Sequence, residues 1–93
     1  MGFTQEEIVN YEVAVDTIRN LISIYTAQQY AEEKKETPNQ DIIDDLNQEI
    51  SRLWQERRDL EISERAKIAR IRFAYGAAVR AFRAENNCER SRR

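Results

Sequence analysis

The stretch IARIRFAYGAAVRAF, residues 68–82, packs apolar side chains densely around three arginines. An α-helix advances 100° per residue, and at that spacing most of the large apolar side chains gather on one side. A second, weaker apolar line, which includes Phe73 and Ala77, runs nearly opposite. Apolar surface of this extent needs a neighbour, because in water it would be an interaction site or an aggregation risk.

The main apolar line of this stretch extends toward the N-terminus without losing its phase. Its members are Ile42, Ile43, Leu46, Ile50, Leu53, Leu60, Ile68, Ile71, Tyr75, Ala78, Val79 and Phe82. Neither glycine nor proline occurs between Pro38 and Gly76. We therefore predict one long helix over residues 38–86. The alternative is a break near Ser63, where the serine would cap a third helix and produce a three-helix bundle.

The start of the long helix has its own signal. In the sequence T-P-N-Q, residues 37–40, Thr37 is the predicted N-cap and Pro38 occupies the first helical position. Gln40 can then reach back to the cap as the third helical residue.

An earlier helix is predicted over residues 5–33. Thr4 and Glu7 have the spacing of a capping box, in which each side chain bonds the backbone N–H of the other. Its main apolar line consists of Ile8, Tyr11, Val15, Ile18, Ile22 and Tyr25. Val9 and Val13 lie off this line, and a helix that is apolar on more than one side has more than one neighbour.

The two predicted helices differ in length and are joined by a short connection, which makes them an antiparallel hairpin. At ~1.5 Å per residue the first spans roughly 43 Å and the second roughly 70 Å. The second helix would then project beyond the first from about residue 68. We predict an all-α hairpin that self-associates through this projection, with a dimer as the first expectation and a four-helix or coiled-coil-like assembly as its form. The predicted interaction surface is Ile68, Ile71, Phe73, Tyr75, Ala78, Val79 and Phe82.

The composition sets the class of the chain. Ninety-three residues are enough for one small domain, here residues 1–87, followed by a basic tail over residues 88–93 that we expect to fray. The single cysteine, Cys88, cannot form an internal disulfide, which favours a reducing compartment. The N-terminus lacks the pattern of a signal peptide, and no apolar run is long enough to span a membrane. The predicted location is the cytoplasm.

Charge is distributed unevenly along the chain. The net charge of −2 combines −9 over residues 1–64, from fifteen acidic and six basic side chains, with +7 over residues 65–93, from nine basic and two acidic ones. This asymmetry predicts an acidic partner for the C-terminal part or association of opposite ends between copies. Candidate phosphate contacts, for a nucleic acid, are Arg65, Arg72, Arg80 and Arg83.

Arg57 interrupts the main apolar line. Residues that face each other across the hairpin should have numbers that sum to about 73, which places Arg57 opposite Asp16, with Glu12 one turn away. We predict that Arg57 forms an ion pair with Glu12 or Asp16, in its own chain or in a second copy, and thereby fixes the register of the helices.

Residues suited to catalysis are scarce. The chain has no histidine and no glycine-rich phosphate loop, and its acidic side chains lack the spacing of known metal sites. We therefore expect no enzymatic activity, cofactor or metal. The predicted function is a protein–protein interaction module, such as an adaptor, a small chaperone or an antitoxin-like or immunity-like inhibitor, whose partner the sequence does not identify. The alternative is a small helical regulator that binds nucleic acid through its basic C-terminal part.

Overall fold

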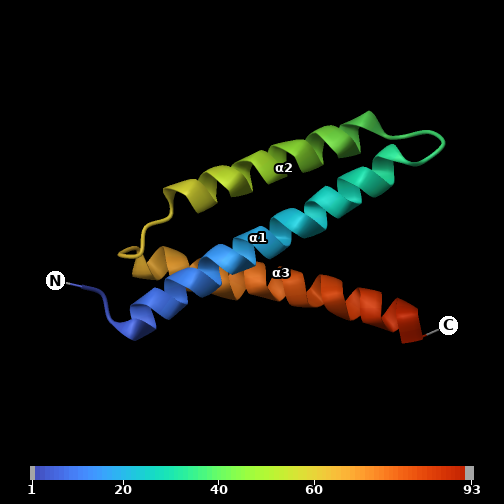
Figure 1. Cartoon of the computed structure of the whole chain (residues 1–93). Helices are drawn as coiled ribbons and strands as arrows, with labels where there is room; N and C mark the ends of the chain where they lie inside the picture. Colours follow the sequence, from blue (N-terminus) through green and yellow to red (C-terminus); the bar gives the residue numbers. More distant parts are fainter. Residues whose placement is uncertain (1, 92–93) are drawn as a thin grey trace.

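The computed structural model describes the backbone of residues 2–91 and the side chains of residues 2–85. This part of the chain contains three α-helices and no strand: α1 (Gln5–Glu33), α2 (Gln40–Asp59) and α3 (Arg65–Ser91). In Figure 1, α2 runs back along α1, and α3 crosses α1 and diverges from α2 toward its C-terminal end. The arrangement is flat, with extents of 56 × 31 × 14 Å.

The start of α1 confirms the predicted capping box. The Glu7 N–H donates to Thr4 Oγ1 at 3.1 Å, and the Thr4 N–H donates to Glu7 Oε1 at 3.0 Å. These two bonds satisfy donors that the first helical turn leaves without partners.

The start of α2 lies two residues later than predicted. Asn39, and not Thr37, is the N-cap, because its side-chain oxygen accepts from the N–H groups of Asp41 and Ile42. The Asn39 N–H is itself held by the buried Glu32 carboxylate at 3.0 Å. Glu32 therefore ties the end of α1 to the start of α2, and Pro38 lies in the connecting loop.

The predicted single long helix is wrong, and the alternative with a break near Ser63 is correct in its break and its third helix, although Glu64 and not Ser63 directly precedes α3. Leu60 has an extended backbone (φ −68°, ψ 128°) and ends α2. In the turn that follows, the Glu64 N–H donates to the Glu61 carbonyl at 3.0 Å, and the Glu61 N–H donates to the Glu64 carboxylate at 2.8 Å. Glu64 then occupies the position before α3, where its carbonyl accepts from the Ile68 N–H.

A continuous apolar phase did not require a continuous helix. Both α2 and α3 turn their apolar sides toward the same core, so the pattern resumes after the break. The signal that could have revealed the break is a gap in the pattern, because the main line has no apolar member between Leu60 and Ile68. A five-residue junction fits into that gap while Leu60, only 4% exposed, stays in the core.

Helix α1 is the central element, since it packs against both of the other helices. Along α2 it runs antiparallel, with Gln29 bonded to Asn47 and Tyr11 bonded to the Leu60 carbonyl. These pairs sum to 76 and 71, close to the predicted value. Along α3 it runs parallel, since the N-terminal turns of both helices meet at the Arg65–Glu7 ion pair.

Helices α2 and α3 meet through polar side chains, and their described backbones do not approach within 8 Å between Cα atoms. The Tyr75 hydroxyl donates to Glu56 at 2.6 Å and accepts from Arg52 at 3.1 Å. Burial of the ring, together with the bond to Glu56, raises the pKa of Tyr75.

One hydrophobic core joins the three helices. Its buried members are Ala14, Ile18, Leu21, Ile22, Leu53, Leu60, Ile68, Ile71 and Val79. At the C-terminal end, α3 continues as far as Ser91, beyond the predicted end near residue 86 and through the first part of the tail predicted to fray. Residues 92 and 93 of the predicted basic tail lie outside the described part of the chain.

Candidate interaction surface

The structure divides the predicted interaction surface between the core and the exterior. Three of its members, Ile68, Ile71 and Val79, are buried in the core of their own chain, so the prediction that they project uncovered is wrong. The reason is the break after Leu60, which folds α3 back onto α1. Two others, Tyr75 and Phe82, are half-buried, and Ala78 and Phe73 are exposed.

Phe73 is the most exposed large apolar side chain of the described residues, at 79%. On the neighbouring α1, Val9 is 47% exposed and Val13 is 38% exposed. Phe73 and Val13 line one hollow between the helices, whose other lining residues are Thr17, Ala69, Arg72, Gly76 and Arg80. We call the surface formed by Val9, Val13, Ala69, Phe73 and Ala77 the Phe73 face.

The residues next to Phe73 on the surface of α3 have small side chains, so the phenyl ring protrudes from its surroundings. Ala69 and Ala77 are exposed and lie four residues to either side of Phe73. A Cβ added to Gly76 would lie 3.1 Å from Arg80 Nη1, so the Arg80 guanidinium rests over the backbone at that point. Short side chains allow a partner backbone to approach closely, and the phenyl ring supplies the area that a partner would bury.

A second hollow continues from the first at the N-terminal ends of α1 and α3. It shares Ala69 and Arg72 with the first hollow and is further lined by Thr4, Glu6, Glu7, Asn10, Ile62, Arg65 and Ile68. Several of its polar groups are bonded to one another. Glu7 accepts from Arg65 Nη2 at 2.8 Å, and Asn10 accepts from Arg72 Nη1 at 2.8 Å. The Thr4 N–H and the Arg65 guanidinium hold the pKa of Glu7 below its ordinary value.

The four predicted phosphate contacts are not equivalent. Arg65 and Arg72 bind side chains of α1, which fixes α3 against α1. Arg80 lies over Gly76, and both Arg80 and Arg83 are exposed. Arg70, which the sequence did not single out, is exposed on the same helix. The two arginines nearest the N-terminal end of α3 therefore have structural partners already.

The predicted ion pair of Arg57 is not formed within the chain. In the described structure no acidic oxygen of Glu12 or Asp16 lies within ion-pair distance of Arg57, and Asp16 instead approaches Arg19 at 3.8 Å. The Arg57 guanidinium lies 5.5 Å from the centroid of the Trp54 ring, and its Nε is buried without a hydrogen-bond partner. Pairing with a second copy stays a prediction.

The described residues offer little for other kinds of site. They contain no cluster of three or more His, Cys, Asp or Glu side chains placed to hold a metal ion. None of the helices in this part combines the length and apolar character needed to cross a membrane. The side chain of Cys88 lies outside the described part.

Comparisons of the chain with protein-family models, with curated proteins and with solved structures found no match.

The sequence contained a signal for the Phe73 face. Val9 and Val13 lie off the main line of α1, and Phe73 lies off the main line of the C-terminal stretch. The fold-back of α3 is not visible in the sequence, and it is this fold-back that places Val13 and Phe73, from two distant segments, in the lining of one hollow.

Proposed function

We propose that this chain is a non-enzymatic protein-interaction module, of the adaptor, small-chaperone or antitoxin-like kind, which acts in the cytoplasm through the Phe73 face. The observation that carries the proposal is the 79% exposure of Phe73 beside the partly exposed Val9 and Val13. Large aromatic side chains dominate the energy of protein interfaces, where a few anchors account for most of the binding. Removing a phenylalanine side chain from water contributes about 1.5–3 kcal/mol.

The attachment of α3 to the rest of the chain does not depend on Phe73, which supports a binding role over a structural one for this residue. The helix that carries it is already fixed to the rest of the chain by Ile71, which is 1% exposed, and by the Arg65–Glu7 ion pair. Phe73 is therefore presented on a rigid helix, and a rigid anchor loses little conformational freedom on binding.

Site-specific cross-linking tests this proposal. A photoreactive amino acid at position 73, introduced in living cells of the source organism, should give protein adducts that mass spectrometry can identify. The matched control is the same amino acid at position 48, an exposed site on α2. The absence of protein adducts at 73 above those at 48 would contradict the proposal.

The second candidate is a nucleic-acid-binding regulator, which is favoured by the exposed Arg70, Arg80 and Arg83 on α3. Contacts with phosphates release counterions, so such binding weakens steeply as salt rises. Mobility shifts with RNA and DNA at low and high salt separate the candidates. Binding at low salt that Arg70→Gln and Arg83→Gln weaken would favour the regulator, and no binding at low salt would remove it.

A further inference from the structure

We propose that the Phe73 face binds a second copy of this chain, with the two copies related by a two-fold axis that runs along the α1–α3 groove. This inference rests on the proposed function, because it assigns a partner to the same surface. It is carried by the charges on the two sides of the face, which are opposite in sign and symmetrically placed.

The two helices that form the face have opposite charge. Helix α1 contains six acidic side chains and one basic side chain, a net charge of −5. Helix α3 contains seven basic side chains and two acidic ones, a net charge of +5. Among the described side chains, part of this charge is neutralised by the ion pairs Arg65–Glu7, Arg19–Asp16 and Lys35–Glu32.

On α1, Glu12 and Asp16 border the face on its outer side, and Asp16 also approaches Arg19 of the same helix at 3.8 Å. Asn10 and Thr17 mark the side of α1 that faces α3, since one accepts from Arg72 and the other lines the groove. Glu12 and Asp16 follow Val9 and Val13 by three residues, which places them on the opposite flank of the valines at 100° per residue. Both acidic residues are exposed, with the side chain of Asp16 at 69%.

On α3, a basic group occupies the corresponding outer position. Gly76 lines the groove and so marks the side of α3 nearest α1. Arg70 precedes Phe73 by three residues and lies on the other flank of the phenylalanine. Arg80 lies farther along, within the groove itself. Across the face the order is therefore acidic flank, valines, groove, phenylalanine, basic flank.

A two-fold axis along the groove makes this order complementary to itself. The rotation places the acidic flank of one copy over the basic flank of the other, and Phe73 over Val9 and Val13 of the second copy. A rotation keeps each residue at its own level along the axis. Phe73 and Val13 line the same hollow, so Phe73 of one copy meets Val13 of the other. An axis across the groove would instead bring like charges together, which opposes association. Closed two-fold interfaces of this isologous kind are the commonest in soluble oligomers.

Mass measurements on the full chain give the first test. Sedimentation equilibrium at tens to hundreds of micromolar should detect a species of twice the 11.0 kDa chain mass. Phe73→Asp should lower the association constant at least about 100-fold, because each dimer contains two such anchors. The matched control, Tyr30→Asp, changes another exposed aromatic residue (61% exposed) at the far end of α1 and should leave association unchanged. Circular dichroism checks that each variant is folded.

Exchange of charge gives the second and sharper test. Arg70→Glu with Arg80→Glu makes the basic flank and the adjoining groove acidic, so that both flanks are acidic, and Glu12→Lys with Asp16→Lys makes both flanks basic. Each double variant alone should be monomeric, and an equimolar mixture should form a one-to-one heterodimer. The control double variant, Glu33→Lys with Glu36→Lys, makes the same change of charge at exposed positions near the α1–α2 loop. This control should still form a homodimer as the wild type does, and it should not form a heterodimer with the acidic variant.

The outcomes separate failure of this inference from failure of the proposed function. A wild-type chain that stays monomeric throughout, or a mixture of the two charge variants that does not associate, overturns the second-copy inference. If position 73 then cross-links to a different protein in cells, the proposed function stands with another partner. If it cross-links to no protein, both fail.

Discussion

Glu32 is the buried acidic side chain of the described residues, at 7% exposure, and it connects the end of α1 to the start of α2 across the loop. Its carboxylate accepts from Lys35 Nζ at 2.9 Å and from the Asn39 N–H at 3.0 Å. These bonds, with that from Lys35 the stronger influence, hold the pKa of Glu32 below its ordinary value. A lowered pKa in the folded state means that the ionised carboxylate stabilises the fold.

The sign of the pH dependence follows from this lowering. The contribution of Glu32 is present above the ordinary glutamate pKa of about 4.3 and is lost as the pH falls through the lower folded value. We expect Glu32→Gln to lower the melting temperature at pH 7 and to flatten its fall between pH 5 and pH 3. The control Glu33→Gln, at an exposed neighbour, should keep the wild-type slope. Equal slopes for Glu32→Gln and wild type, measured by thermal unfolding, would contradict this role.

Arg57 has a buried Nε without a partner, which costs free energy because the group has left water without a compensating bond. We expect Arg57→Leu to preserve or raise the melting temperature, since leucine keeps the apolar contacts of the stem. If Arg57 instead pairs with a carboxylate of a second copy, Arg57→Leu should allow more than one oligomeric state. Arg58→Leu, at the exposed neighbour, should bring no gain. A clear loss at Arg57 alone, with the oligomer unchanged, would show that its guanidinium stabilises the monomer.

Helix α3 has two apolar sides with different roles, and adjacent substitutions separate them. Ile71 is 1% exposed and Phe73 is 79% exposed. Ile71→Ala should cost about 2–5 kcal/mol in free energy of unfolding, because it removes core contacts and leaves a cavity. Phe73→Ala should stay within about 0.5 kcal/mol at dilute, monomeric concentrations, as is usual for exposed positions. Urea unfolding measures both, and similar costs at the two positions would contradict this division.

The comparison of sequence with structure shows which helix signals are reliable. The Thr4–Glu7 box was predictable because both partners are local in sequence. The later cap at Asn39 was not, because it depends on the buried carboxylate of Glu32 from the preceding helix. The prediction of one helix across residues 60–64 fails because the phase of the apolar line does not measure continuity: it reports only which side of each helix meets the core.

The candidate site was predictable only in part, for a similar reason. The sequence pattern predicts the second apolar side of α1 and places Phe73 on an apolar side of its helix. Their meeting depends on the reversal of the chain at Leu60, which is a tertiary event. The same reversal placed Ile68, Ile71 and Val79 in the core and removed them from the predicted surface.

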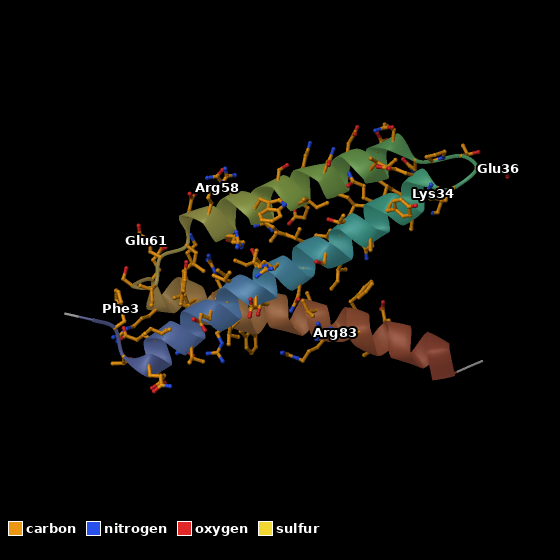
Figure 2. The ribbon with its side chains drawn as sticks, viewed as in Figure 1. Phe3, Lys34, Glu36, Arg58, Glu61 and Arg83 are labelled. Carbon is orange, nitrogen blue, oxygen red and sulfur yellow. The ribbon has the colours of Figure 1, made fainter. Side chains whose placement is uncertain are left out.

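The whole molecule is a flat three-helix arrangement in which α1 is covered by α2 along one side and by α3 along another. Figure 2 shows Phe3 and Glu61 at one end of this arrangement and Lys34 and Glu36 at the other, so the two connections between helices lie at opposite ends. The core buries one apolar side of each helix. The apolar surface outside the core includes the Phe73 face, which joins the N-terminal half of an acidic helix to a basic one.

The central claim is that the Phe73 face binds a partner, with a second copy as the occupant. A dilution series followed by NMR of the ¹⁵N-labelled chain tests it most directly, because each amide reports on its own surroundings. On dilution from millimolar to low micromolar concentration, the account predicts shifts of the amide signals of Val9, Val13 and Phe73 along one binding curve, with those of Asp44, Asp45 and Gln48 on α2 unchanged. Shifts confined to α2, or spectra that do not change at any position, would contradict it.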